Sequence, residues 1–286
     1  MSVKSSFGHC QDFDPGWFHS SAMEAGISPP NQPISQDLSF TRRFGIAHAL
    51  EMSTDRKGST VRLQFEQKLG NLKNRVLVMA GMAEQAIQRA VEAHQTRDLS
   101  ICDLVDYGER AIDRMEREID EMAAGLLATQ QPLAHDLRFT LAVIKINGNL
   151  ERVGNAAGSV SDYVRSLQTY PLVDLPVDIP RMASLAQGTM RDALRAFVEA
   201  DGDRAQSVLS VDDGMDQLHK TAYLSLSRLI ERQSELIPQA LTTLMIARNL
   251  WRVAGHAKSI AEDVIFCVRG ADVRSHMQHA GDGWTN

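Results

Sequence analysis

The stretch 141–164, LAVIKINGNLERVGNAAGSVSDYV, returns 100 residues later as 241–264, LTTLMIARNLWRVAGHAKSIAEDV. Nine aligned positions are identical, and they include Asn149/Asn249, Leu150/Leu250, Arg152/Arg252, Val153/Val253, Ala157/Ala257 and Ser159/Ser259. Apolar residues in both copies fall three and four apart, which is the spacing of an amphipathic α-helix. The chain therefore contains an internal duplication, and each copy holds a helix of this kind.

Two more helical patterns precede the first copy. One predicted helix spans about 63–94 and carries the apolar stripe Phe65, Leu69, Leu72, Val76, Met79 and Met82. A second carries Val105, Ile112, Met115, Ile119, Met122 and Leu126 at nearly the spacing of a bundle seam, and ends at 130–132, QQP. Because proline is tolerated in the first turn of a helix, the third helix is predicted to run from about Pro132 to Leu167.

The same cycle follows a proline-rich boundary. Residues 170–180 hold Pro171, Pro176 and Pro180 and cannot continue a helix. Helical spacing then resumes over about 181–200, 204–232 and 238–270. We therefore predict an all-α protein with six long helices in two tandem three-helix bundles, a first repeat at 61–170, a linker at 171–180 and a second repeat at 181–272.

The two ends differ in composition from the repeats. Residues 1–60 are rich in Ser, Gly and Pro and lack a sustained helical period, so we predict a flexible extension, with Met52 as an alternative start of translation. Residues 273–286 are predicted to be a flexible tail, in which the pair His276 and His279 is incidental.

Composition excludes several classes of protein. The formal net charge of -6 argues against nucleic acid as a partner, since such binding depends on Lys and Arg. Cys10, Cys102 and Cys267 lie far apart and show neither zinc-site nor disulfide spacing. Neither a membrane-spanning run nor a signal peptide is evident, so a cytoplasmic location is expected, with any membrane association made through partners.

A family resemblance enters through the residues around the first copy. The stretch 127–138, LATQQPLAHDLR, followed by 149–154, NLERVG, resembles the central signature of the PhoU family. Residues 112–119, IDRMEREI, and 259–265, SIAEDVI, resemble other blocks of that family, and the likeness covers roughly 62–276. It implies a non-catalytic, cytoplasmic repressor of the phosphate-starvation response that joins the ATPase subunit of a phosphate ABC transporter to a sensor histidine kinase. A homodimer is expected.

Two pairs of acidic residues are the candidate metal-binding site. Glu109 and Asp113, like Asp212 and Asp216, are one helical turn apart, a spacing that suits a shared hard cation but also suits a solvated surface. The resemblance implies divalent or iron ions on such pairs, with a second motif on the third helix of each repeat. That motif reads Glu151 to Asn155 in repeat one and Trp251 to Gly255 in repeat two. The implied cofactor is therefore weakened in repeat two, and the candidate ligands are Glu109, Asp113, Glu151, Asn155, Asp212 and Asp216.

Other readings of the residues remain open. A metal-binding or metal-buffering bundle is the alternative function, and His256 is a candidate replacement ligand near Trp251. His135 and Asp136 are better explained by a helix start than by catalysis, and the chain contains no phosphate loop, nucleophile elbow, HExxH or paired CxxC. The basic residues Arg138, Arg152 and Arg252 are expected to hold helices together through ion pairs.

Overall fold

The computed structural model describes residues 56–130, 132–210, 213–271 and 273. Its helices are α3 (Arg56–Thr96), α4 (Leu99–Gln130), α5 (Ala134–Leu167), α6 (Ile179–Glu199), α7 (Gly202–Ser210), α8 (Asp213–Arg232) and α9 (Ile237–Arg269), with the single turn η2 (Ser234–Leu236) before α9. The predicted all-α class is confirmed. Residues 1–55 of the extension, Met52 among them, lie outside the described residues, as do Asp212 and the pair His276/His279. The prediction that the extension reaches residue 60 is wrong, because α3 already begins at Arg56.

The predicted helices match these elements closely, apart from the earlier start of α3 and the division of one helix. The helix expected over about 204–232 is described as α7 and α8, and residues 211–212 between them lie outside the description. Repeat one is thus α3–α4–α5, and repeat two is α6–α7/α8–α9. Within the described residues, no helix combines the length and apolar character that crossing a membrane requires.

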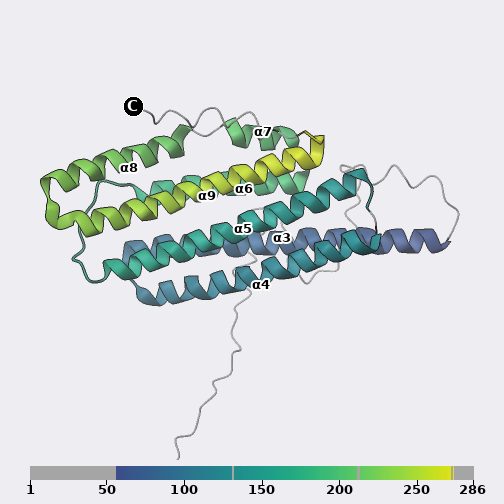
Figure 1. The fold of residues 1–286 in the computed structure, drawn as a ribbon, viewed down its shortest axis with the longest axis horizontal. Coiled ribbons are helices and arrows are strands. Elements are labelled where there is room, and N and C mark those ends of the chain that lie inside the picture. The colour runs from purple at the N-terminus through teal and green to yellow at the C-terminus, as the bar shows by residue number, and fades with distance from the viewer. Residues whose placement is uncertain (1–55, 131, 211–212, 272, 274–286) are drawn as a thin grey trace, which may run out of the picture.

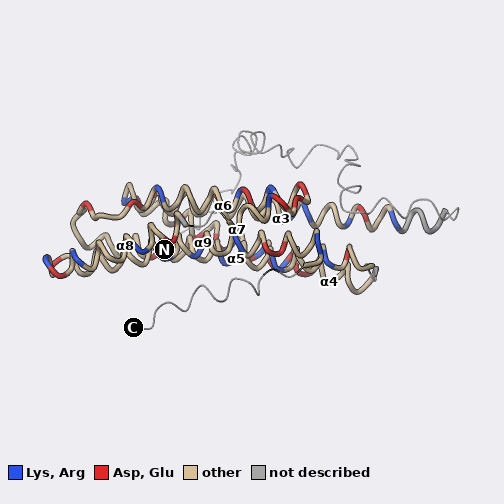
Figure 2. The backbone as a smooth tube through the Cα atoms, turned by 90° about the horizontal axis from the view of Figure 1, so that it is seen from above, with Lys and Arg blue, Asp and Glu red and all other residues tan. Residues whose placement is uncertain are grey.

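The helices lie in two layers. Helices α8, α9, α5 and α4 follow one another across the front layer, and α3 and α6 lie behind them (Figures 1 and 2). Each repeat therefore contributes its first helix to the back layer and its third helix to the middle of the front layer. The third helices, α5 and α9, form the most extensive contact between any two elements.

Each repeat leaves its first helix through the same kind of turn. Arg97 after α3 and Ala200 after α6 adopt left-handed backbone conformations, with φ of 58° and 51°. The aspartate that follows each accepts a backbone hydrogen bond two residues on: Asp98 Oδ1 from Ser100 N at 2.8 Å, and Asp201 Oδ1 from Asp203 N at 3.0 Å. A left-handed residue ends one helix and the aspartate stabilises the start of the next, so the duplication extends to the helix junctions.

One hydrophobic core is shared by the two repeats. Its largest fully buried side chains come from both: Phe197, Leu72, Met79, Ile87, Ile112, Ile119, Ile146, Leu150, Leu167, Ile179, Met182 and Met190. Phe139 of α5 stacks on Phe197 of α6 with ring centroids 5.8 Å apart. Because apolar burial is the main stabilising contribution to folding, neither repeat is expected to retain full stability alone.

Helices α5 and α9 run antiparallel around an approximate twofold axis. Lys145 Nζ lies 3.5 Å from Asp263 Oδ1, and Asn149 Oδ1 lies 3.2 Å from His256 Nδ1, so numbers rise along one helix as they fall along the other. Since the copies are offset by 100 residues, this pairing places Val153 and Val253 near the point where the twofold axis passes between α5 and α9. Both valines are fully buried.

We predict that Gly154→Ala destabilises the protein. An added Cβ would lie 3.0 Å from Cδ1 and 3.2 Å from Cγ2 of Ile112, a side chain that is fully buried. Overpacking of this kind costs about 1–3 kcal/mol, which exceeds the roughly 1 kcal/mol that alanine gains over glycine within a helix. Urea denaturation followed by circular dichroism measures the change.

Gly148→Ala is the matched control. It lies on the same helix, and nothing comes within 4 Å of the place that an added Cβ would occupy, so this change should raise stability by about 0.5–1 kcal/mol. Equal stability changes in the two variants would contradict the close contact at Gly154.

Candidate functional site

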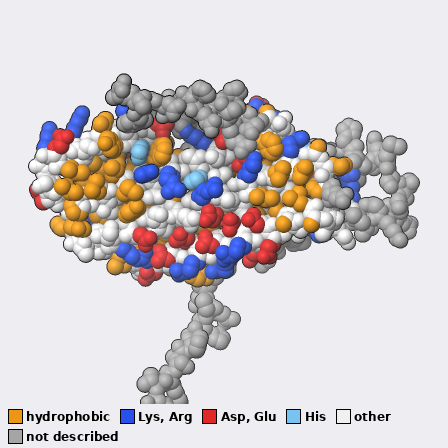
Figure 3. All heavy atoms as spheres, in the orientation of Figure 1, with side chains coloured by type: hydrophobic (Ala, Val, Ile, Leu, Met, Phe, Trp, Pro, Cys, Tyr) orange, Lys and Arg blue, Asp and Glu red, His pale blue; other side chains and the backbone are white. Residues whose placement is uncertain are grey.

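An acidic stripe on α4 faces α5. Its members fall three and four residues apart, and together they define the acidic seam: Asp106, Glu109, Asp113, Glu116 and Asp120. All except Asp120 are half-buried. Figure 3 shows acidic side chains gathered in a band along this part of the front face. The seam includes two of the predicted ligands, Glu109 and Asp113.

Glu109 lies against the backbone of α5 at a glycine. A Cβ on Gly158 would come within 2.1 Å of Glu109 Oε2, so only glycine leaves the carboxylate this position. Burial raises the pKa of Glu109, and the neighbouring charges of Asp113 and Asp106 raise it further. The carboxylate is therefore crowded by like charge.

Glu116 is in a similar position about two turns further along the seam. Its pKa is raised by burial and then by the charges of Asp120 and Glu151. Glu151 Oε1 accepts a hydrogen bond from Asn155 Nδ2 at 2.6 Å, so Asn155 presents its amide nitrogen, not its oxygen, to the carboxylate. At position 155 the side chain therefore offers an N–H donor to Glu151 and carries no negative charge of its own.

The candidate ligands of repeat one do not converge on one point. Among the described residues there is no group of three or more His, Cys, Asp or Glu side chains placed to hold a metal ion. The fold brings the four candidate ligands of repeat one to the interface between α4 and α5. They are spread along this interface: Glu109 and Asp113 on α4, and Glu151 and Asn155 on α5. The described side chains therefore do not form a ready-made metal centre.

One end of the seam is neutralised by a residue that the sequence analysis missed. Arg165 Nη2 lies 2.7 Å from Asp106 Oδ2 and 2.9 Å from Asp103 Oδ1. The hydrogen bonds that Arg165 donates to Asp106, followed by the one to Asp103, raise its pKa despite its partial burial. Asp106 therefore forms an ion pair with Arg165 that joins α4 to α5. The sequence offered no signal for it, because its partners are about sixty residues away.

Repeat two has an aromatic side chain where repeat one has Glu151. Trp251 Nε1 donates a hydrogen bond to Asp216 Oδ1 at 2.5 Å, and the indole stacks on His219 with ring centroids 5.2 Å apart. The carboxylate of Asp216 is thus satisfied by an N–H donor. His219, three residues after Asp216 on the same helix face, was not singled out from the sequence, although that spacing could have pointed to it.

His256, the proposed replacement ligand, bonds across the repeats. Its Nδ1 faces Asn149 Oδ1 at 3.2 Å. Burial, together with the charges of Arg252 and Arg152, lowers the pKa of His256 to about 4. The expectation that Arg152 and Arg252 form ion pairs is wrong for the part of the chain described, in which neither guanidinium has a carboxylate within salt-bridge distance.

Arg138 also differs from its expected role. Its guanidinium packs against the end of α9, about 3.7 Å from where a Cβ on Gly270 would lie. Gly270 ends α9 in a left-handed conformation with φ of 70°. A cation suits the negative end of a helix dipole, so Arg138 joins the start of α5 to the end of α9 without a carboxylate partner among the described residues.

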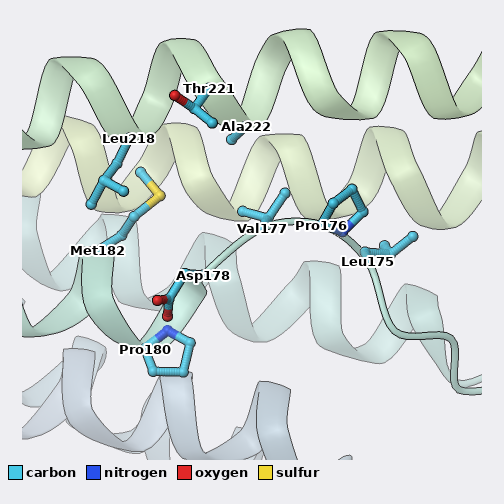
Figure 4. A pocket seen from close by; sticks show the side chains of 9 residues that line it. All are labelled: Leu175, Pro176, Val177, Asp178, Pro180, Met182, Leu218, Thr221 and Ala222. Atoms are coloured by element: carbon cyan, nitrogen blue, oxygen red, sulfur yellow. The ribbon is translucent and has the colours of Figure 1, made fainter.

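The linker between the repeats borders a separate hollow of about 460 Å³ (Figure 4). Its lining is mostly apolar and comes from the linker, the start of α6 and α8: Leu175, Pro176, Val177, Asp178, Pro180, Met182, Leu218, Thr221 and Ala222. The one carboxylate, Asp178, accepts a hydrogen bond from Arg181 N at 3.0 Å and so stabilises the start of α6. This hollow therefore offers shape and apolar surface but no reactive group.

Comparisons with known proteins place these features in a family context. The PhoU domain matches the chain over residues 76–164 and again over 179–264. The chain is 34% identical over 214 residues to the phosphate-specific transport system accessory protein PhoU homolog of Pseudomonas aeruginosa, covering 74% of this chain and 88% of that protein. Against the PhoU accessory protein of Escherichia coli the identity is 29% over 214 residues, covering 74% and 88%.

Solved structures agree with these matches. The crystal structure of PhoU from Pseudomonas aeruginosa aligns with a TM-score of 0.70 at 32% identity, covering 72% of this chain and 100% of the other. The phosphate transport system regulatory protein PhoU from Streptococcus pneumoniae aligns with a TM-score of 0.65 at 24% identity, which speaks to the fold alone. The two-repeat helical architecture is shared by both.

We predict that the protein loses stability in mild acid because of two histidines. Burial, then the charge of Arg97, lowers the pKa of His94 to about 4, the same value as for His256. A histidine with a lowered folded-state pKa contributes full stability above about pH 6.5, and this contribution is lost as the pH falls toward 4. By about pH 5 His94 should cost on the order of 2 kcal/mol, and His256, which is more exposed and therefore more screened by solvent, should cost less.

Urea titrations at neutral pH and near pH 5 measure this loss, and the double variant His94→Gln, His256→Gln should show a much smaller one. The raised carboxyl pKa values of Glu109 and Glu116 act in the opposite direction, stabilising the fold as the pH falls, so the comparison between proteins isolates the histidines. An equal acid sensitivity in the double variant would contradict the assignment.

Proposed function

The chain belongs to the PhoU family, and from this membership we propose that it is a negative regulator of the phosphate-starvation response and of phosphate uptake. The observation that carries the proposal is the match of the PhoU domain to both repeats, supported by the shared fold. The relatives it matches are named as accessory proteins of a phosphate-specific transport system. The role is proposed to be regulatory and non-catalytic.

The proposed mechanism is contact inhibition by an adaptor. The front face offers an acidic band on α4, basic side chains over the middle of α5 and α9, and apolar side chains toward both ends (Figure 3). Such a surface suits protein partners, which we propose to be the ATPase subunit of a phosphate ABC transporter and a sensor histidine kinase. If the adaptor binds the kinase differently in different transporter states, transporter activity changes kinase output. A cytoplasmic homodimer is part of this proposal.

Deleting the gene is expected to raise transcription of phosphate-starvation genes in phosphate-rich medium, because the inhibiting contact is lost. Reporter expression compared with wild type measures the effect, and a plasmid copy of the gene should reverse it. Unchanged expression in the deletion strain would count against the regulatory role.

Affinity purification tests the partners directly. The tagged protein from phosphate-replete cells should recover the transporter ATPase or a sensor kinase. The variant Asp113→Asn, Glu116→Gln, which removes two seam charges while keeping shape, should recover less if the acidic band is the contact surface. Arg228→Gln on α8, an exposed site with no ion pair among the described residues, is the matched control. Recovery of neither partner would exclude the adaptor mechanism.

A specific observation favours metal binding as a second candidate function. Glu109 and Glu116 have raised pKa values partly because neighbouring carboxylates crowd them, and a hard divalent cation or an iron ion would relieve that repulsion. The side chains would have to turn toward a common point to ligate it. In repeat two, the indole of Trp251 already satisfies Asp216, so binding there is expected to be weaker.

We therefore predict that metal loads repeat one before repeat two. Glu109→Ala with Asp113→Ala should lower the metal content of chelator-treated and reloaded protein, as measured by elemental analysis. Trp251→Glu with Gly255→Asp should raise the metal content, because two carboxylates replace an indole and a hydrogen. If the alanine variant loses no metal, the seam is a solvated acidic surface.

A further inference from the structure

Two arginines from different repeats flank the approximate twofold axis on the front face. Arg152 of α5 and Arg252 of α9 occupy equivalent positions in the two copies, and both are exposed. Arg152 follows Asn149 by three residues on α5 and Arg252 precedes half-buried His256 by four on α9, so the 3.2 Å contact between Asn149 Oδ1 and His256 Nδ1 brings both arginines to one face of the α5/α9 interface. Arg152, Arg252 and His256 define the basic cluster. Figure 3 shows basic side chains with a histidine among them over this region.

The basic cluster has positive charge that the described residues do not neutralise. Neither Arg152 nor Arg252 has a carboxylate within salt-bridge distance in the described part of the chain. Other surface arginines do: Arg191 pairs with Glu84 at 2.6 Å and Arg75 with Glu118 at 2.9 Å. Guanidinium N–H donors are thus available from two helices beside one imidazole.

The hydrogen bonds of Asn149 fix the proton on that imidazole. Asn149 Nδ2 donates to the carbonyl oxygen of Lys145 at 3.1 Å, so its Oδ1 faces His256 and must accept a hydrogen bond. Nδ1 of His256 therefore carries the proton. Because the pKa of His256 is lowered to about 4, the ring is neutral near pH 7 and its Nε2 keeps a lone pair that accepts hydrogen bonds.

A hollow of about 340 Å³ lies between α5 and α9, and Arg152 is the member of the basic cluster that borders it. Its lining includes Arg152, Asn149 and the hydroxyl-bearing Ser259. Two acids, Glu262 and Asp263, also line it. Asp263 pairs with Lys145 at 3.5 Å, and the charge of Glu262 partly offsets the burial that lowers the pKa of nearby Lys258. A lysine thus lies near each acid and offsets its charge, and the end of the hollow that Arg152 borders remains positive.

We propose that the basic cluster binds inorganic hydrogen phosphate, with the guanidinium groups of Arg152 and Arg252 donating to its oxygens and its hydroxyl donating to His256 Nε2. A guanidinium fork matches phosphate oxygens bidentately, and two forks from separate helices reach different oxygens of one tetrahedral anion. The acceptor on His256 selects an anion that still carries a proton. Near about pH 7.5, inorganic phosphate has that hydroxyl, whereas sulfate and a phosphomonoester do not.

This inference goes beyond the proposed function, because it concerns a ligand of the purified protein and needs neither transporter nor kinase. A bound phosphate would bridge the two repeats at the point where α5 and α9 cross. Failure of the adaptor role would leave the site intact, and failure of the site would leave the adaptor role intact.

Isothermal titration calorimetry of the full chain at low chloride tests the proposal. Inorganic phosphate should bind, and sulfate and glycerol phosphate should bind about tenfold more weakly or worse, since each lacks the hydrogen bond to His256. Arg152→Gln and Arg252→Gln should each weaken phosphate binding about tenfold or more. His256→Ala should reduce the preference for phosphate over sulfate while leaving sulfate affinity nearly unchanged.

Arg228→Gln, the same change of charge on α8, should bind phosphate like wild type. Circular dichroism melting of every variant shows whether the fold is retained, and both arginines are exposed, so folding is expected. Absence of phosphate binding in wild type, equal affinity for sulfate or glycerol phosphate, or unchanged binding in the two arginine variants would each overturn the proposal.

Discussion

The antiparallel packing of α5 against α9 is the constraint on which the rest of the structure depends. These helices are the duplicated segments, and each is covered on several sides: α5 by α3, α4 and α9, and α9 by α5, α6, α7 and α8. Helices buried on so many sides must be apolar or small around most of their circumference. Once they cross near Val153 and Val253, the remaining helices have only the flanks and the back layer to occupy.

The approximate twofold axis created by this crossing also determines which charged side chains of the two repeats lie close together. Equivalent residues such as Arg152 and Arg252 come close to one another because they lie near the axis, whereas equivalent residues far from it are separated. The acidic seam on α4 lies on the outer flank of the molecule. On the equivalent helix of repeat two, the carboxylate of Asp216 is hydrogen-bonded by Trp251. The two repeats therefore share the order of their helices but differ in charge.

That asymmetry has an electrostatic consequence for function. In repeat one, carboxylates crowd each other along α4 and keep a strong local negative field. In repeat two, the indole N–H satisfies Asp216, and burial together with the charges of neighbouring arginines lowers the pKa values of His219 and His256. A partner or ion would meet two different surfaces on the two halves of one fold, so the repeats are not interchangeable in binding.

The sequence by itself determined the helical class, the two repeats and the proline-rich boundary, because periodicity and proline act locally and are legible in one dimension. Spacing also placed Glu109 and Asp113 on one helix face, whereas Glu151 was added to them only through the resemblance to the PhoU family. Only the tertiary structure decided that those carboxylates line a seam without converging, that Trp251 engages Asp216, and that Arg152 and Arg252 flank His256. These outcomes depend on the register between helices far apart in the chain, which is set by packing of the whole core and has no local signature.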